Sequence, residues 1–79
     1  MPTTNAYDQF IKLLKQKAKV GFDKDVLLQK HHILPLHAGG LVSGETVLCS
    51  IEDHAKAHLI RYEVYSQVQD KIAALFIGC

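Results

Sequence analysis

Two pairs of histidines constrain this chain more than any other feature of its sequence. His31 and His32 are adjacent, His54 and His58 are four residues apart, and a Gly-Gly pair lies between the two groups. Residues at i and i+4 lie on one face of a helix, so His54 and His58 can bind one ion together. Neutral imidazole is the commonest metal ligand and a natural proton acceptor near pH 7. The spacing predicts a strand carrying the first pair packed against a helix carrying the second.

The length and composition predict one small domain over residues 1–79. A chain of 79 residues is near the size at which an apolar core alone is only marginally sufficient, and such domains often gain stability from a metal ion, a disulfide or a partner. Its hydrophobic content of 48% is ordinary for a globular protein. No apolar run approaches the roughly 18 residues of a membrane span, and no secretory signal opens the chain. We expect an intracellular, non-secreted protein without a membrane partner.

The cysteine spacing limits which residues can hold a metal ion, and the net charge bears on whether the partner carries phosphate. Cys49 and Cys79 have no C-x-x-C partner, which excludes a cysteine zinc ribbon and favours free thiols. A metal ion must therefore be held by histidine and carboxylate. The net charge of +1 neither establishes nor excludes a phosphate-bearing partner, although residues 1–30 carry six lysines against three aspartates.

The hydrophobic pattern predicts an α+β fold. The predicted elements are, in chain order, a helix over residues 6–19, a strand within 26–34, a strand over 46–49, a helix over 51–65 and a short helix over 70–76. Thr4 or Asn5 is the expected cap of the first helix and Gly21 its stop. Pro35 should end the first strand, and Ser50 should cap the second helix.

Strand geometry divides the roles of the adjacent histidines. Side chains alternate across a strand, so His31 and His32 cannot both face one ion. One can bind metal beside the helical pair while the other accepts a proton from water, as metal-assisted phosphodiester hydrolysis requires. A zinc-protease site is excluded, because the glutamate that it needs after the first helical histidine is Ala55 here. The structural alternative for each ring is a buried, hydrogen-bonded histidine.

The segments HHILPLHAGG (31–40), VLCS (47–50) and EDHAKAH (52–58) resemble the HNH endonucleases, in particular intron-encoded, homing and phage members. The resemblance covers residues 30–75 and implies a ββα-metal core over 26–65 that hydrolyses double-stranded DNA. It implies that His31, His54 and His58 hold one divalent metal ion and that His32 is the general base. Three imidazoles favour zinc, nickel, cobalt or manganese, whereas relatives with Asp and Asn ligands use magnesium.

One position departs from the HNH pattern. Glu45 stands nine residues before His54, where the family has asparagine. An ionised carboxylate accepts hydrogen bonds but cannot donate them, and it adds negative charge near an incoming phosphate. Glu45 is therefore expected either to act at the site, by orienting an imidazole, or to weaken the enzyme.

Further candidates and alternatives follow from the same resemblance. His37 and Arg61 are candidate phosphate or DNA contacts; otherwise His37 completes the turn, and Arg61 forms a surface ion pair with Glu63 or Asp70. The alternatives to an active endonuclease are a non-catalytic, metal-stabilised nucleic-acid-binding module and a degenerate HNH remnant. A homodimer is one way to supply DNA specificity. The resemblance implies a plastid or mitochondrion, or the cytoplasm of a phage-infected host.

Overall fold

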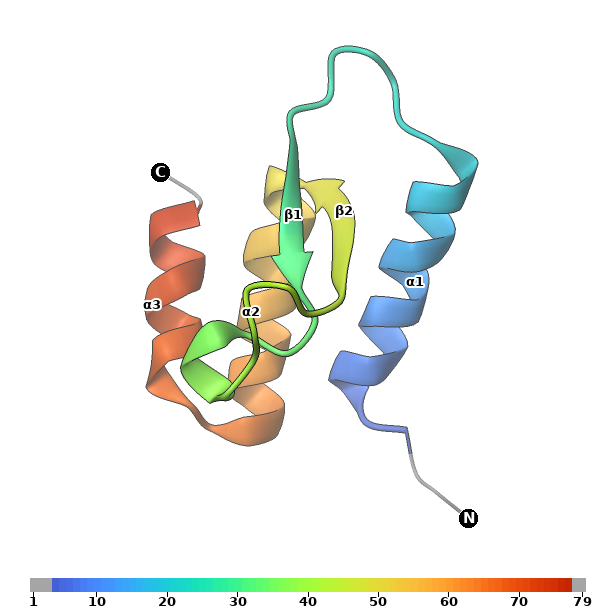
Figure 1. Cartoon of the computed structure of the whole chain (residues 1–79). Coiled ribbons are helices and arrows are strands. Elements are labelled where there is room, and N and C mark those ends of the chain that lie inside the picture. Colours follow the sequence, from blue (N-terminus) through green and yellow to red (C-terminus); the bar gives the residue numbers. More distant parts are fainter. Residues whose placement is uncertain (1–3, 78–79) are drawn as a thin grey trace.

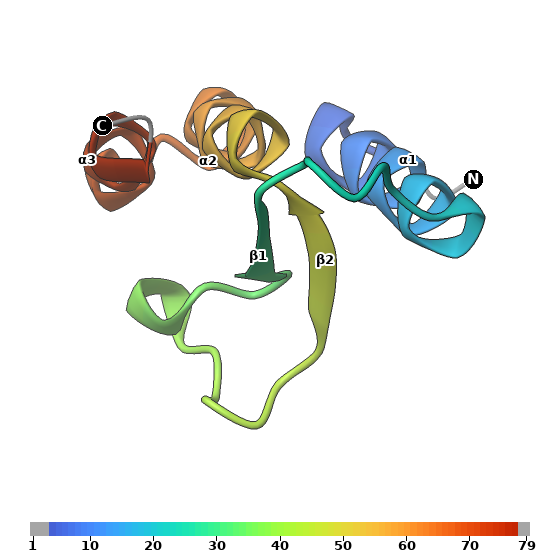
Figure 2. The same cartoon turned by 90° about the horizontal axis from the view of Figure 1, so that it is seen from above.

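The structure is a computed structural model and describes residues 4–77. It has the predicted α+β class and the predicted order of elements (Figure 1). The elements are α1 (Ala6–Val20), β1 (Leu28–His32), the short 3-10 helix η1 (Leu36–Ala38), β2 (Thr46–Ser50), α2 (Ile51–Tyr65) and α3 (Val68–Ile77). The three α-helices lie side by side with α2 in the middle, and the β-hairpin packs beneath them (Figure 2). No helix within the described residues is long and apolar enough to cross a membrane.

Local signals in the sequence set both ends of α1. The Asn5 side chain accepts a hydrogen bond from the backbone N–H of Asp8 at 2.8 Å, which satisfies one of the otherwise unpaired donors of the first turn. Gly21 ends the helix with a φ of 103°, in a region that favours glycine, and its N–H reaches the Lys17 carbonyl. The expected cap and stop are therefore confirmed.

The two strands pair antiparallel in a register that fixes the direction of each histidine. The Cα of His31 lies opposite that of Val47, and both side chains are buried, whereas the neighbouring pair His32 and Thr46 is only half-buried. β1 is shorter than the predicted strand because the chain bends at Ile33 to enter the Pro35 turn. One more backbone hydrogen bond, from Ile33 N–H to the Glu45 carbonyl, continues the pairing at 3.1 Å.

The helical hairpin of α2 and α3 also follows from local chemistry. Ser50 caps α2 by accepting a hydrogen bond from the N–H of Asp53 at 3.1 Å, as expected. α2 ends at Ser66, which adopts a left-handed conformation with a φ of 57° and donates its N–H to the Tyr62 carbonyl. α3 begins at Val68, two residues before the predicted start, so that Asp70 falls in its first turn.

An apolar core fills the space between α1, β2 and α2. Its buried members are Tyr7, Phe10, Ile11, Leu14, Val47, Cys49 and Ala57. The four from α1 form the face that the spacing of apolar residues predicts. Cys49 is a free thiol, and burial raises its pKa to about 11, which makes it unreactive. Cys79 lies outside the described residues.

The loop between the strands is held by a close backbone approach. Gly39 has a φ of 96° and ends η1, as the predicted glycine turn requires. Gly40 donates its N–H to the Pro35 carbonyl, and a Cβ at this position would overlap the Leu34 carbonyl oxygen. The loop therefore returns against its own start, and this packing sets the position of His37 on η1.

Candidate metal centre

Three imidazoles meet where β1 crosses α2. One ring nitrogen from each of His31, His54 and His58 lies within 4.8 Å of the other two. The ring centroids are 4.8 to 5.3 Å apart. The structure therefore brings together the three residues that the sequence suggested as ligands, in a group that can hold a metal ion.

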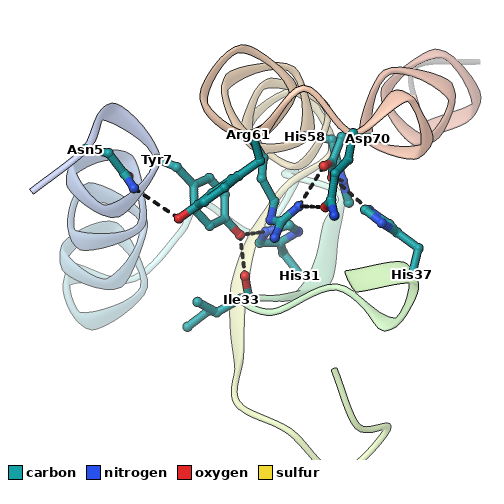
Figure 3. Close-up of polar contacts among 10 residues, drawn as sticks. Asn5, Tyr7, His31, Ile33, His37, His58, Arg61 and Asp70 are labelled. Carbon is teal, nitrogen blue, oxygen red and sulfur yellow. Dashed lines mark hydrogen bonds and ion pairs between the residues drawn. The ribbon is translucent and has the colours of Figure 1, made fainter. Parts of the chain in front are cut away.

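The hydrogen bonds around His31 determine which of its nitrogens carries the proton. The Tyr7 hydroxyl lies 2.6 Å from the Ile33 carbonyl oxygen, which can only accept, so the single hydroxyl hydrogen points there (Figure 3). The 2.7 Å contact between this hydroxyl and His31 Nε2 must then have Nε2–H as the donor. His31 Nδ1 consequently keeps a lone pair, and it is buried with no hydrogen-bond partner among the described residues. A buried acceptor without a donor is costly, and a bound cation would satisfy it.

The two helical histidines have the same arrangement. His54 Nδ1 is 2.7 Å from the amide oxygen of Gln29, and His58 Nδ1 is 2.8 Å from Oδ1 of Asp70. Both partners are acceptors, so Nδ1 carries the proton in each ring and Nε2 keeps the lone pair. Metal-bound histidines characteristically donate their other ring N–H to a carboxylate or carbonyl oxygen in this way. In each of the three neutral rings, the nitrogen without a hydrogen-bond partner among the described residues is therefore the one left to bind a metal ion.

The surroundings favour the neutral, metal-binding form of two of these rings, His31 and His54. Burial, followed by the nearby His58 and His54, lowers the pKa of His31 from 6.5 to about 3. Burial and His58 lower the pKa of His54 to about 4. A neutral ring presents its lone pair to a cation without first losing a proton, so His31 and His54 are ready to bind metal at neutral pH.

Asp70 joins three elements beneath the cluster. It is fully buried, and its Oδ1 accepts hydrogen bonds from His58 and from His37 Nε2 at 3.0 Å, while Oδ2 accepts one from Arg61 at 2.8 Å (Figure 3). Burial, the largest single influence, raises the pKa of Asp70, but the hydrogen bonds from His58, Arg61 and His37 outweigh it, and the pKa is lowered overall. Asp70 is therefore an ionised acceptor. His37, His58 and Asp70 form a second group with metal-ligand spacing, but hydrogen bonds already join them.

His32 takes a different direction from its neighbour. Its Nε2 lies 3.1 Å from the Val42 carbonyl oxygen, to which it must donate, so Nδ1 is the nitrogen that can accept a proton. Beside it is an open hollow of about 220 Å³. The hollow is lined by Lys30, His32, Pro35, Leu36, His37, His54 and His58, and by no carboxylate among the described residues. The Lys30 ammonium group, with no carboxylate among the described residues of this lining, makes the hollow suited to an anion.

The remaining predicted residues are not members of the three-histidine cluster. The Glu45 carboxylate is exposed and forms an ion pair with Lys15 of α1 at 3.0 Å. Arg61 is 5% exposed and forms the ion pair with Asp70 that we considered as its alternative role, although in the interior rather than on the surface. His37, on η1, is connected to the cluster through Asp70, because its Nε2 donates a hydrogen bond to the same carboxylate oxygen that accepts one from His58.

Three residues of this network were not assigned to the site from the sequence. Tyr7 was expected only as part of the apolar face of α1, and nothing local indicates that its hydroxyl reaches His31. Asp70 was considered only as an ion-pair partner of Arg61. Gln29 had a usable signal, because it precedes His31 by two residues and so lies on the same face of the strand.

Comparison with known proteins gives one informative relative. The chain is 43% identical over 68 residues to an uncharacterized 38.5 kDa protein in psbA intron 1 of Chlamydomonas moewusii. The match covers 85% of this chain and 19% of the relative, so the chain spans about a fifth of that protein's length. No protein-family model matches the chain, and no solved structure matches it. The comparisons therefore link the chain to a protein encoded in an intron, and the three histidines with metal-ligand spacing indicate the chemistry available to it.

Proposed function

We propose that this chain is an HNH-type endonuclease domain that hydrolyses phosphodiester bonds in double-stranded DNA with one divalent metal ion. The observation that carries the proposal is the buried Nδ1 of His31, which has no partner among the described residues, in a ring grouped with His54 and His58 at metal-ligand spacing. These three imidazoles suit zinc, nickel, cobalt or manganese better than magnesium. His31, His54 and His58 would hold the metal ion.

The bound ion would supply Lewis-acid stabilisation of the charge that develops on the scissile phosphate and the leaving oxygen. The chain's own residues provide the rest. His32 donates Nε2–H to the Val42 carbonyl, and this hydrogen bond leaves Nδ1 to accept a proton from the attacking water. Because His31 and His32 project from opposite faces of β1, ligand and base are adjacent in sequence without competing for the ion.

Lys30 and His37 are the proposed phosphate contacts. Both line the hollow that also contains His32, and Lys30 offers a positive charge for a DNA phosphate. Arg61 is a weaker candidate than its sequence position suggests, because its guanidinium group is buried against Asp70.

The intron location of the relative supports a homing role, since the HNH proteins that this chain resembles include intron-encoded homing enzymes. An organelle is accordingly the proposed location, with the cytoplasm of a phage-infected host as the alternative. The chain matches about a fifth of the relative, so DNA sequence specificity would come from further protein outside the matched region or from a homodimer.

Plasmid cleavage by the purified protein tests the proposal. We expect nicking or cutting when zinc, nickel, cobalt, manganese or magnesium is added in parallel, and none in chelator. His32→Ala should lower the cleavage rate about 10²–10⁴-fold, the usual contribution of a general base, while metal affinity measured by titration stays nearly unchanged. His58→Ala should weaken metal binding as well. Full activity and full metal affinity in both variants would disprove the assigned roles.

A second candidate is a metal-stabilised module that binds nucleic acid without cleaving it, or an HNH remnant. Glu45 favours it, because the residue in the family's asparagine position is exposed and paired with Lys15. Metal-loaded protein that binds a DNA duplex in a gel-shift assay and leaves plasmids intact would support this candidate over the endonuclease. Metal-loaded protein without DNA affinity would point to the remnant.

A further inference from the structure

Asp70 is the only acidic side chain among the described residues that is fully buried, and it belongs to a helix that contributes no histidine to the cluster. Its three side-chain partners come from two elements: His58 and Arg61 lie three residues apart on α2, and His37 lies on η1. The carboxylate thus ties α3 to the helix that carries His54 and His58, and to the loop between the strands (Figure 3).

We propose that Asp70 is a positioning residue that makes metal binding by the three histidines conditional on the docking of α3 against α2. This inference rests on the metal site of the proposed function. It concerns a residue that would not touch the metal ion and a helix that provides none of its ligands.

The two oxygens of Asp70 have separate tasks. Oδ2 receives the Arg61 guanidinium at 2.8 Å, and this ion pair holds the carboxylate in place. Oδ1 then faces His58 Nδ1 at 2.8 Å and can only accept a hydrogen bond. In the neutral His58 ring the single proton is therefore held on Nδ1, and Nε2 has the lone pair. Without Asp70 the proton can move to Nε2 and block the position where the metal would bind.

Because Asp70 lies on α3 and His58 lies on α2, their hydrogen bond also links these two helices. α3 follows α2 after residues 66–67, and Asp70 lies in its first turn. When α3 separates from α2, the Asp70 carboxylate loses its hydrogen bonds with His58 and with Arg61 at the same time. Coupling between two equilibria is reciprocal, so metal that binds only the docked form must also stabilise the docking of α3.

The first test uses the metal-free wild-type protein, so it depends neither on cleavage nor on metal. Nitrogen–proton NMR correlation of the histidine rings reports which nitrogen of His58 is protonated. We expect the Nδ1–H form in the wild type and the Nε2–H form to appear in Asp70→Asn, whose side-chain amide can also donate to Nδ1. A wild-type His58 protonated on Nε2 would overturn the inference.

The second test measures zinc affinity by competition with a chelator. Asp70→Asn should bind zinc about 10–100-fold more weakly, the range typical for loss of a hydrogen-bonding partner of a metal-bound histidine. Glu63→Gln removes the same charge from an exposed position on α2 and should bind zinc as the wild type does. Equal affinity in all three proteins would refute the positioning role and leave the metal site standing.

Amide hydrogen exchange tests the link to α3 without any substitution. Saturating zinc should slow exchange in α3 as strongly as in the turns of α2 that carry His54 and His58. Slower exchange in α2 with unchanged exchange in α3 would refute the coupling. If the wild type binds none of the metals, the proposed function fails, and the NMR result still decides separately whether Asp70 orients His58.

Discussion

Helix α2 separates two interiors of opposite character. On the side of α1 the buried residues are almost all apolar, with Leu14 and Ala57 completely enclosed. On the side of α3 the buried residues include His58, Arg61 and Asp70, joined by hydrogen bonds and an ion pair. Apolar burial stabilises a fold in proportion to area, whereas a buried ion pair gains little after desolvation and can repay its cost through precise placement. The comparison indicates that the buried residues on the α1 side mainly stabilise the fold, whereas those on the α3 side mainly hold polar side chains in position.

Leu14→Ala attacks the apolar interior and should have the largest effect. Removal of a fully buried leucine side chain costs about 2–5 kcal/mol, because it loses transfer free energy and leaves a cavity. Urea denaturation measures this change. Leu13→Ala is the matched control, since the neighbouring leucine is 43% exposed and should cost much less. Similar losses in both variants would contradict the assignment of the α1 side as the stabilising core.

Metal binding should stabilise the protein through the polar interior. At a zinc concentration one hundred times the Kd, mass action adds about 2.7 kcal/mol to the free energy of unfolding, provided the unfolded chain does not bind. His58→Ala should lose most of this gain, and His32→Ala should keep it. Thermal melts with zinc and with chelator measure the difference. A gain that survives in His58→Ala would place the metal elsewhere.

Acid should lower the free energy of unfolding of the metal-free protein, because it protonates histidines of the three-histidine cluster. His31 and His54 have folded pKa values of about 3 and 4, below the 6.5 of the unfolded chain, so between these values the unfolded state binds more protons. Stability is therefore fully present above about pH 6.5 and falls as the pH decreases toward 4. The slope reaches at most about 1.4 kcal/mol per pH unit for each group that titrates fully. His31→Gln, measured by denaturation in chelator, should flatten this slope; an unchanged slope would assign the acid sensitivity to other groups.

Glu45→Asn lies outside both interiors and should change stability least, by no more than about 0.5 kcal/mol. It breaks an exposed ion pair with Lys15, and such pairs contribute little. Lys15→Gln breaks the same pair from the other side and serves as the control. If the endonuclease is weakened by its glutamate, Glu45→Asn alone should raise the plasmid cleavage rate. Equal rates in wild type and both variants would show that this position does not limit activity.

The two interiors also differ in how much of them could be predicted from the sequence. The apolar face of α1, its Asn5 cap and the Ser50 cap of α2 follow from short-range patterns, and all three are confirmed. Strand alternation and helix periodicity predicted that one of His31 and His32 would join the helical histidines, and the resemblance to HNH endonucleases indicated His31.

The hydrogen bonds that orient the rings were not predictable in this way. Tyr7 is 24 residues from His31, and Asp70 is 12 from His58, so each contact depends on how separate elements dock. The same holds for Arg61, whose position near His58 suggested either a phosphate contact or an ion pair with Glu63 or Asp70, and which is buried in an ion pair with Asp70 of α3. Residue type indicated what these side chains can do, and tertiary packing decided which partner each one meets.

The close backbone approach at Gly40 limits which substitutions this loop can accept during evolution. Because any side chain there would meet the Leu34 carbonyl oxygen, a change at this position would push the loop outward and carry His37 away from Asp70. Natural variation in descendants should therefore be scarcer at Gly40, which performs no chemistry, than at exposed loop positions such as Leu41 and Val42. The substitutions that this loop tolerates should therefore depend on its backbone geometry as much as on the chemistry of the site.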